Sequence, residues 1–573
     1  MPLRTSAWRN RRRAGIMTGA PGSRTGGGAL MKPLITSLLL SLLTTALGCG
    51  SETTAGPVPP VEQPPVDYVI VAADTLAGAA DRYREYRQGT GHQVAVGLMS
   101  EVVGGEQDAA VATELIRQYV RGHYDVRDAD APMFLLIIGD STADWAGDLG
   151  AVPAGAYYDD FNNGQKITSD NVYADMDGDH MPDLAVGRIA AATEGDVDLV
   201  RQKVQTSESI YQVGPWNRRV NAFASTAGFG GMIDDLIETL AFTIVESASY
   251  DFDVSMTYAK QDSPFVFIPE QFSDKVYERI NEGALWVVYV GHGDVDAFAT
   301  LEWNGSHYPI LDTAELDELA VTHRQPILCV VACLTGAFDS GDSFSERVLK
   351  AAGGPSAILS STEISHPLTN AIFIYESSQV VTHLRPSTLG EVFVMSKERM
   401  VNHQDALRDE IDSFGELMLA PGEAAALLLT HLHMYTLFGD PGSRIVYPQS
   451  VTDLVLSPMP ATTGSEITIA ASLGDLGDGD GLVTLETTRS VLAGELESVP
   501  ADGDPNRDAV IAANYQTAND KVIVSQSVSH SAGGLSATLQ IPADLAAGDY
   551  YVKIYADDGA SDAMGSVLLV VEP

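Results

Sequence analysis

The chain alternates short apolar runs with stretches of helical periodicity from about residue 67 onward. An apolar run of about four to eight residues, bounded by polar or turn-forming positions, predicts a buried β-strand. Residues 75–91 and 108–122 instead repeat apolar side chains at helical spacing, and the first of these stretches closes with glycine. The predicted strands cover residues 68–73, 93–99, 133–140, 220–226, 284–290, 326–332 and 356–362.

Strands that are apolar throughout and separated by helices predict a parallel sheet that is covered by helices on both faces. In sheets of this kind, ligands bind beyond the carboxyl ends of the strands. The pattern changes near residue 450, after which short alternating strands dominate and helix signals are almost absent. The predicted fold class is therefore α/β over residues 67–449, followed by an immunoglobulin-like β-sandwich over residues 450–573.

The N-terminal residues predict export. Met31 and Lys32 precede an apolar stretch of 14 residues, 34–47, which is soon followed by Cys49. This stretch is shorter than the roughly 20 residues that span a bilayer. We expect residues 1–49 to be a leader with a lipoprotein-type signal peptide, Cys49 to carry the lipid, and residues 50–66 to form a Pro-rich linker. The protein would then be secreted, or held at the outer membrane or cell surface by its lipid alone.

The charge balance narrows the possible partners. The 573 residues include 34 Lys and Arg against 77 Asp and Glu, which gives a formal net charge of −43. A surplus this large repels nucleic acid and anionic membrane surfaces, so neither is expected as a partner. An acidic surplus keeps a protein soluble, and acidic side chains can also bind calcium. Apart from a structural calcium ion no cofactor is expected, and the sequence gives no indication of an oligomeric state.

Residues 175–183, DMDGDHMPD, place carboxylates at the first, third, fifth and ninth positions of a tight loop. Oxygen atoms at this spacing suit a hard cation, so Asp175, Asp177, Asp179 and Asp183 are candidate calcium ligands. The loop is not an EF-hand, because its glycine stands two positions early and the bidentate glutamate is missing. The alternative interpretation is an Asp-rich turn.

Two of the predicted strands end on reactive residues. Strand 284–290 runs into His292, which is flanked by glycines, and strand 326–332 ends on Cys333. A thiolate nucleophile needs an imidazole nearby, and two neighbouring strand ends of one rigid sheet would hold that pair in place. A glycine beside the imidazole lets a backbone N–H approach a developing oxyanion. Taken separately, a lone histidine or a buried cysteine is more often structural, but the shared context favours a catalytic pair.

The two strand ends and the motifs around them, taken in their order along the chain, resemble the gingipain-type cysteine peptidases of the caspase-like clan. The shared features are an apolar run with His-Gly in "YVGHG" and a second run with Ala-Cys in "VVACLTGAF". The stretches "FLLIIGD", "MPDLAVGR", "GGPSAILSST" and "LFGDP" match as well. The resemblance covers about residues 67–447. It implies an N-terminal α/β subdomain over residues 67–215, a caspase-like catalytic subdomain over residues 216–449 and an immunoglobulin-like module after it.

The resemblance also implies a mechanism. Cys333 would attack the peptide carbonyl, the backbone N–H groups of Cys333 and Gly293 would hold the oxyanion, and His292 would protonate the departing amine. Substrates would be proteins or peptides outside the cytoplasm. Some members place a carboxylate near the histidine, where this chain has Ala227.

Three acidic residues are candidates for binding substrate. Asp234 and Asp235 could match the residue that binds a basic P1 side chain in the gingipains, although aspartates at this place also cap helices. Glu363 follows a predicted strand and would line the cleft, or it is a solvated loop residue. The aromatic residue expected near His366 is missing. The acidic candidates favour cleavage after Arg or Lys, and the missing aromatic residue argues against it.

Three other functions fit the sequence less well. A serine esterase would use residues 139–141, Gly-Asp-Ser, but the required Asp-x-x-His pair is missing near the end of the α/β region. On one strand, Cys329 and Cys333 would lie about 13 Å apart, which is too far for a shared zinc ion or for a disulfide. A surface adhesin or binding module on a degenerate peptidase scaffold is the main alternative, and Ala227 is the feature in its favour.

Overall fold

The computed structural model describes residues 65–573 except for residues 106, 129, 130, 144, 160, 162, 163, 210, 229, 231 and 322. The predicted signal peptide, Cys49 and the linker up to residue 64 lie outside the described residues. Within the described part of the chain, no helix has both the length and the apolar character that crossing a membrane requires.

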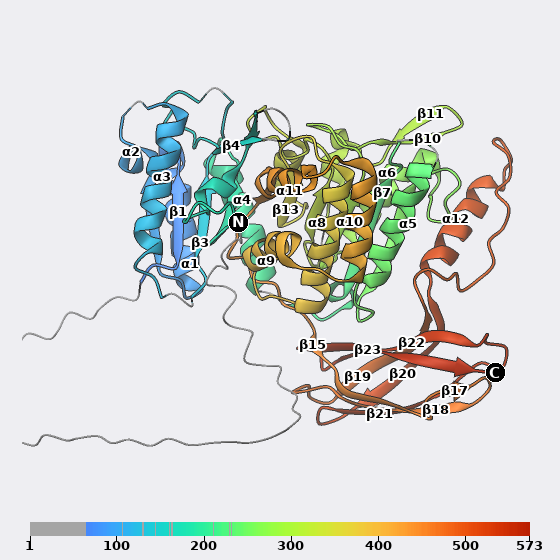
Figure 1. Ribbon diagram of the computed structural model, residues 1–573. Helices are drawn as coiled ribbons and strands as arrows, with labels where there is room; N and C mark the ends of the chain where they lie inside the picture. Colours follow the sequence, from blue (N-terminus) through green and yellow to red (C-terminus); the bar gives the residue numbers. More distant parts are fainter. Residues whose placement is uncertain are drawn as a thin grey trace, which may run out of the picture.

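A ten-stranded sheet runs through the body of the molecule (Figure 1). In spatial order its strands are β2 (Val94–Leu98), β1 (Tyr68–Ala72), β3 (Phe134–Ile138), β6 (Ala185–Ile189), β14 (Tyr435–Phe438), β13 (Ala357–Ser361), β12 (Ile327–Val331), β9 (Trp286–Val290), β7 (Arg219–Ser225) and β8 (Asp253–Ala259). β14 pairs parallel with β6 but antiparallel with β13. The sheet is therefore mostly parallel, with two parallel blocks that run in opposite directions.

The expectation of a wholly parallel sheet is wrong at the junction of β13 and β14. β14 is a buried run of four residues that follows α11 directly. It is the last strand of one parallel block and joins that block to β13 of the other. A short apolar run of this kind predicts a strand but carries no information about its direction. Within each block, the predicted parallel pairing is confirmed.

Helices cover both faces of the sheet (Figure 1). Side chains of β12 alternate between two cores, with Leu328 and Val330 in one and Cys329 and Val331 in the other. Helices α6 and α7 pack on the first core, and α5 and α8–α11 on the second. The helices of the α/β unit are α1 (Ala77–Gly89), α2 (Met99–Val102), α3 (Ala109–Tyr124), α4 (Glu194–Ser209), α5 (Met232–Ser247), α6 (Phe272–Asn281), α7 (Phe344–Lys350), α8 (Pro367–Gln379), α9 (Leu389–Asn402), α10 (Ala406–Met418) and α11 (Glu423–Met434).

The C-terminal residues form two sheets around a separate core. One sheet pairs β16 (Thr452–Ser457), β18 (Glu466–Ser472) and β21 (Gly534–Gln540). The other pairs β15 (Gln449–Ser450), β23 (Asp562–Glu572), β22 (Gly548–Asp557), β19 (Gly479–Thr487) and β20 (Val522–His530), with β17 (Ala461–Thr462) beside β23. The two sheets enclose Ile467, Val483 and Ile554 among other apolar side chains. We call this unit the sandwich.

The connection between β19 and β20 carries a helix, α12 (Arg507–Asn519), in a region where helix signals are almost absent. Its buried side chains are Arg507, Ile511, Tyr515 and Ala518. Ile511 and Tyr515 belong to the core of the α/β unit rather than to that of the sandwich. The expectation of an almost helix-free C-terminal region is wrong here, because α12 is stabilised by a partner that lies outside the sandwich.

α12 also covers the outer edge of strand β8. The Asn519 side chain accepts a hydrogen bond from the backbone N–H of Met256 (2.7 Å) and donates one to the carbonyl oxygen of the same residue (3.0 Å). The Tyr515 hydroxyl lies 2.8 Å from that of Thr257. A side-chain amide thus occupies the hydrogen-bonding groups that another strand would use.

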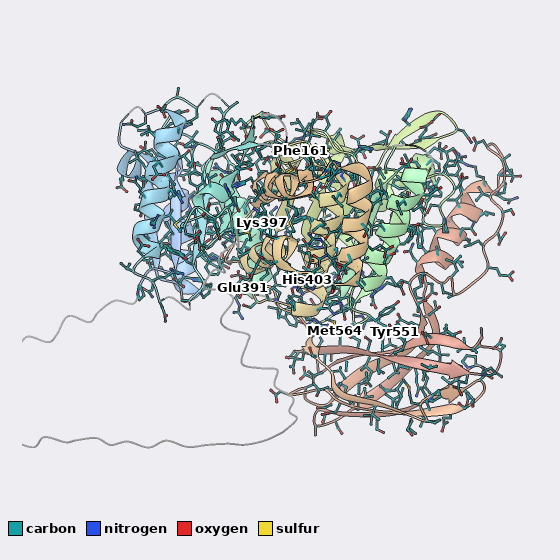
Figure 2. All side chains as sticks on the ribbon, in the orientation of Figure 1. Phe161, Glu391, Lys397, His403, Tyr551 and Met564 are labelled. Carbon is teal, nitrogen blue, oxygen red and sulfur yellow. The ribbon has the colours of Figure 1, made fainter. Side chains whose placement is uncertain are left out.

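The sandwich and the α/β unit share a polar and aromatic junction. The ring of Tyr551 stacks on that of Tyr250, with centroids 3.5 Å apart, and Met564 joins the second core of the α/β unit. Figure 2 places both sandwich residues on the side that faces the helices. Tyr211 donates a hydrogen bond to Asp562. The two units are therefore in direct contact through side chains of both.

Candidate active site

His292 and Cys333 leave the sheet side by side. β9 and β12 are adjacent and parallel, and Val290 pairs with Val331 in their register. His292 and Cys333 each stand two residues beyond these paired positions. Because neighbouring strands lie about 4.8 Å apart, the two loops start from neighbouring points of the same sheet edge.

The two loops are in close contact at Gly293. A Cβ atom on this residue would lie 2.7 Å from Cγ2 of Thr335 and 2.9 Å from both Cβ of Ala332 and the carbonyl oxygen of Cys333. Distances below about 3 Å leave no room for a side chain. Glycine is therefore the residue that lets the histidine loop meet the cysteine loop.

The first turn of α7 holds both loops. The Phe344 N–H donates to the carbonyl oxygen of Val295 in the histidine loop (2.6 Å), and the Ser345 N–H donates to that of Thr335 in the cysteine loop (3.0 Å). α7 starts with a capping box in which Glu346 accepts hydrogen bonds from Ser343. Burial raises the pKa of Glu346 to about 7. Both loops are thus tied to one well-capped helix end.

The His292 imidazole is oriented by a main-chain carbonyl group. Its Nε2 lies 2.5 Å from the carbonyl oxygen of Ala227. A carbonyl oxygen only accepts hydrogen bonds, so Nε2 carries the proton and Nδ1 is the nitrogen that gains and loses one. The His292 carbonyl accepts hydrogen bonds from the Tyr289 hydroxyl (2.7 Å) and the Ala299 N–H (3.0 Å). Ala227 therefore supplies a backbone oxygen at the place where a carboxylate was expected.

Cys333 is half-buried, whereas Cys329 is buried in β12, and both are free thiols. The Ser365 N–H donates to the sulfur of Cys333 (3.4 Å), and the Ser365 hydroxyl lies 3.7 Å from it. The next residue, Leu334, has a positive φ of 60° and donates its N–H to the carbonyl oxygen of Glu363 (3.1 Å). A positive φ at a bulky residue such as Leu334 is strained, and strained residues of this kind are found preferentially at functional sites.

Glu363 and Asp339 are two acidic residues on the cysteine side of the site, and the Lys166 ammonium lies 4.0 Å from the Asp339 carboxylate. Burial and then the charge of Asp339 raise the pKa of Glu363. The Glu363 carboxylate accepts a hydrogen bond from Gln165 (3.3 Å), and Asp339 accepts one from Thr168 (2.5 Å). Asp339 is absent from the sequence-based candidates, although its position shortly after Cys333 in an irregular segment is a signal that could have found it.

Asp234 and Asp235 lie on the histidine side, in the first turn of α5. The Asp234 carboxylate accepts a hydrogen bond from the backbone N–H of Gly230 (3.0 Å). The same loop brings Ala227 to His292. The structure therefore separates the three predicted substrate-binding residues, with Asp234 and Asp235 beside the histidine loop and Glu363 beside the cysteine loop.

The acidic loop brings three of its four predicted calcium ligands together. Ligand oxygens of Asp175, Asp177 and Asp183 all lie within 4.8 Å of one another. Asp179 is not part of this group, and its carboxylate accepts a hydrogen bond from the Met181 N–H (2.9 Å). Burial raises the pKa of Asp183, and the charge of Asp177 adds to this effect. Crowded carboxylates of this kind fit a divalent cation.

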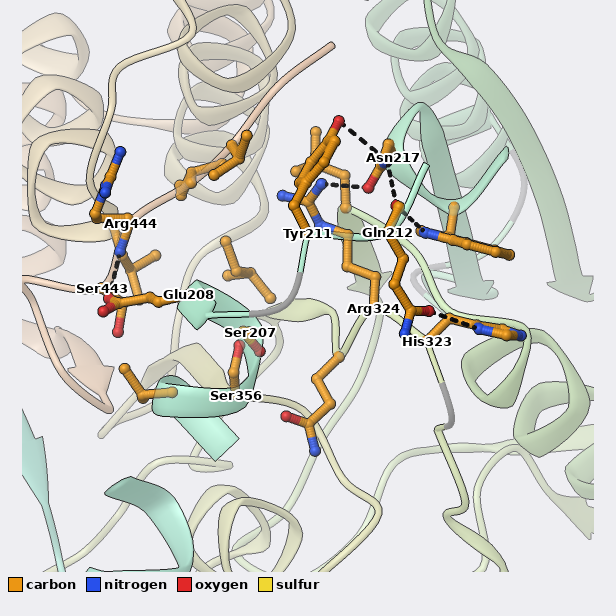
Figure 3. A pocket seen from close by; sticks show the side chains of 18 residues that line it. Ser207, Glu208, Tyr211, Gln212, Asn217, His323, Arg324, Ser356, Ser443 and Arg444 are labelled. Carbon is orange, nitrogen blue, oxygen red and sulfur yellow. Dashed lines mark hydrogen bonds between the residues drawn. The ribbon is translucent and has the colours of Figure 1, made fainter. Parts of the chain in front are cut away.

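A pocket of a different character lies at the opposite ends of β9 and β12 (Figure 3). Leu285 and Ile327, at the start of these strands, line it together with Arg324. The Arg324 guanidinium donates to the Asn217 side chain (2.8 Å), which in turn donates to Asp562 of the sandwich (3.0 Å). Neither His292 nor Cys333 lines this pocket, so it is separate from the candidate active site.

Residues 61–446 match the family model described as peptidase family C25. The chain belongs to this family. It is a cysteine-type peptidase, and the resemblance to the gingipain-type enzymes is confirmed. No significant match was found among curated proteins.

Solved structures with a similar fold include the Arg-specific cysteine proteinase gingipain R, with 17% identity over 89% of this chain and 99% of that one and a TM-score of 0.49. The complex of the Porphyromonas gingivalis RgpB pro- and mature domains has 16% identity, coverage of 88% and 100%, and a TM-score of 0.48. A further protease structure has 13% identity, coverage of 88% and 97%, and a TM-score of 0.50. At 13% identity, the third similarity concerns the fold alone.

Proposed function

We propose that the protein is an exported cysteine endopeptidase in which Cys333 and His292 form the catalytic dyad. The observation that carries this proposal is the register of β9 and β12, which brings the two residues to adjacent points of one sheet edge. The close contact at Gly293 and the carbonyl group of Ala227 then fix the two loops and the imidazole. These contacts support a dyad whose two members are positioned by the loops that carry them.

The proposed reaction starts with attack of the Cys333 thiolate on the peptide carbonyl carbon, which forms a C–S bond and an oxyanion. Within the described part of the chain, neither the Gly293 nor the Cys333 N–H donates to a main-chain carbonyl oxygen, so both suit the oxyanion. The His292 imidazolium donates its Nδ1 proton to the amine as the C–N bond breaks. A water molecule, deprotonated by the same nitrogen, then hydrolyses the thioester and releases the thiol.

The direct test is hydrolysis of a mixed peptide library by the protein without residues 1–49. Cleavage within the peptides is expected, and the positions of the cuts will report the P1 preference. A folded, calcium-loaded protein that cuts no peptide would contradict the endopeptidase and would favour the binding module as the alternative.

We further propose a preference for Arg or Lys at P1, supported by the position of Glu363, whose carbonyl oxygen accepts a hydrogen bond from the residue after Cys333. Replacing Glu363→Gln should lower kcat/KM for peptides with a basic P1 residue about tenfold, because one charge-assisted contact is lost. Peptides with a neutral P1 residue should be cut at an unchanged rate. Asp81→Asn, which alters an exposed carboxylate on α1, is the matched control. An equal loss for both kinds of peptide would refute the proposed role.

We also propose that Asp175, Asp177 and Asp183 bind a structural calcium ion. Chelation should lower the Tm by about 5 °C or more, since a ligand bound to the folded state alone stabilises it by mass action. Asp175→Asn should remove the response to calcium, whereas Asp179→Asn should keep it because Asp179 lies outside the ligand group. Calorimetry with and without calcium measures both. A response that is lost equally in both variants would show that the ligand set is wrong.

Export and lipid attachment at Cys49 are part of the proposal and rest on the signal-like residues 31–49. Cys49→Ser should move the protein from the detergent phase to the aqueous phase in a phase-partition assay.

We also propose that the sandwich is immunoglobulin-like, which its two sheets around one core support.

A further inference from the structure

A second pocket lies between the α/β unit and the sandwich, with a volume of about 360 Å³. Strands β7 and β8 and helix α6 line it from one side, and β19, β22 and the start of β20 from the other. Six cationic side chains line it against three carboxylates, those of Asp253, Glu486 and Asp520. The cations are Arg218, Arg219, Arg279, Arg489, Lys521 and Lys553. In a chain of net charge −43, this pocket reverses the overall balance.

The carboxylates of the pocket are already engaged by part of its cations. Asp253 accepts hydrogen bonds from Arg218 (2.6 Å) and Lys553 (2.5 Å), and Lys553 also lies 3.1 Å from Glu486. Burial alone would raise the pKa of Asp253, yet the charges of Lys553 and Arg218 hold it below its usual range. Arg219 and Arg279 lie 3.7 and 3.2 Å from the carboxylate of Glu282, which does not line the pocket. Four of the six cations are therefore paired with carboxylates, which leaves Arg489 and Lys521.

Two cations of the pocket contact carbonyl oxygens instead. Lys521 donates to the carbonyl oxygen of Val491 (2.9 Å). Arg489 donates to five carbonyl oxygens at and beyond the end of α5, the shortest contacts being those to Ala248 (2.6 Å) and Ser249 (2.7 Å). Among the described residues, neither cation forms an ion pair within 4.0 Å. Burial lowers the pKa of both side chains. Carboxylates act on both charges without direct contact, Glu246 and Asp520 on Lys521 and Glu246, Glu486 and Asp253 on Arg489. An anion in the pocket would add the direct contact that is missing.

We propose that this pocket binds a small multivalent oxyanion, with phosphate or carboxylate groups, that ties the sandwich to the α/β unit. Arginine guanidinium groups match such groups with two parallel hydrogen bonds, and lysine adds a point charge. The volume lies at the lower end of the range of small-molecule sites. Both units contribute cations, so the bound anion strengthens their association. The acidic surface elsewhere disfavours non-specific anion binding.

The test is titration calorimetry on the purified full-length protein with pyrophosphate and, in a second arm, citrate. We expect binding by at least one of these anions, together with a rise in Tm, and the two arms decide between phosphate and carboxylate groups. Lys521→Met keeps the aliphatic part of the side chain but should weaken binding about tenfold. Lys521→Arg should retain it. Lys350→Met is the matched control, because Lys350 pairs with Asp342 and does not line the pocket.

Binding of neither anion at about 10 mM would overturn the proposal. Equal losses in Lys521→Met and Lys350→Met would also overturn it, because the effect would then follow net charge and not the pocket. If Lys521→Met fails to fold, retained binding in Lys521→Arg together with weaker binding in Arg279→Gln supports the site, and unchanged binding in Arg279→Gln contradicts it. All readouts are independent of peptidase activity.

Discussion

Replacing Cys333 by alanine should lower kcat/KM for peptide hydrolysis at least about a thousandfold, because the proposed nucleophile is lost. The contacts at Gly293 involve the side chains of Thr335 and Ala332 and the Cys333 carbonyl group, and those at the first turn of α7 involve backbone atoms. This substitution removes none of these atoms. The variant should therefore fold and still bind peptides. Steady-state kinetics on one fluorogenic peptide, together with a binding assay on the same peptide, measures both quantities.

Cys329→Ala is the matched control, since this second free thiol lies in β12, the strand that leads to Cys333, four positions upstream. Cys329 is buried in the core, and burial raises the pKa of its thiol well above the usual range. It should therefore stay protonated and inert. We expect activity within about twofold of the unaltered enzyme and a loss of stability of about 1 kcal/mol. Equal activity of both variants would refute the assignment of Cys333.

Gly293→Ala should reduce kcat about a hundredfold and the free energy of unfolding by about 1–3 kcal/mol. The added methyl group would lie 2.7–2.9 Å from Thr335, Ala332 and the Cys333 carbonyl group, so the two loops must separate. Separation displaces both His292 and the proposed oxyanion donor. The effect should appear in kcat more than in KM, because these groups act in the transition state. Kinetics and thermal unfolding measure the two losses.

Gly122→Ala serves as the control for the glycine substitution. Gly122 lies within α3, and an added Cβ atom would have nothing within 4 Å. Alanine is the better helix former, so this variant should gain up to about 1 kcal/mol and keep its activity. Full activity in Gly293→Ala would mean that the two loops do not depend on their contact at this glycine.

The sequence predicts most strands of the sheet because each buried strand is an apolar run of its own. The same pattern indicates that His292 and Cys333 stand at strand ends, and the register of β9 and β12 makes those ends neighbours. The direction of β14 does not follow from the sequence, because it depends on which edges of the two blocks remain open. The sequence does not predict α12 for a related reason. Its side chains Ile511 and Tyr515 are buried in the core of the α/β unit, not in that of the sandwich that carries the helix.

The polar details of the site are harder to predict than its position. The hydrogen-bond partner of His292 is a backbone oxygen, which every residue carries, so the identity of Ala227 gives no signal for it. Asp339 follows Cys333 by six residues, but its effect on Glu363 depends on the fold, because the two are 24 residues apart in the sequence. In the acidic loop, sequence spacing alone predicts four aspartates as calcium ligands, whereas the conformation of the loop brings only three of these four together.

The contact between Asn519 and β8 bears on how the enzyme stays in solution. β8 is the last strand of a large sheet, and an open edge of this kind recruits strands from other molecules. Asn519 satisfies both backbone groups of Met256 from within the same chain. A cut in the connection that carries α12 would release this block and expose the edge. α12 therefore protects this point of the sheet edge from pairing with a strand of another molecule.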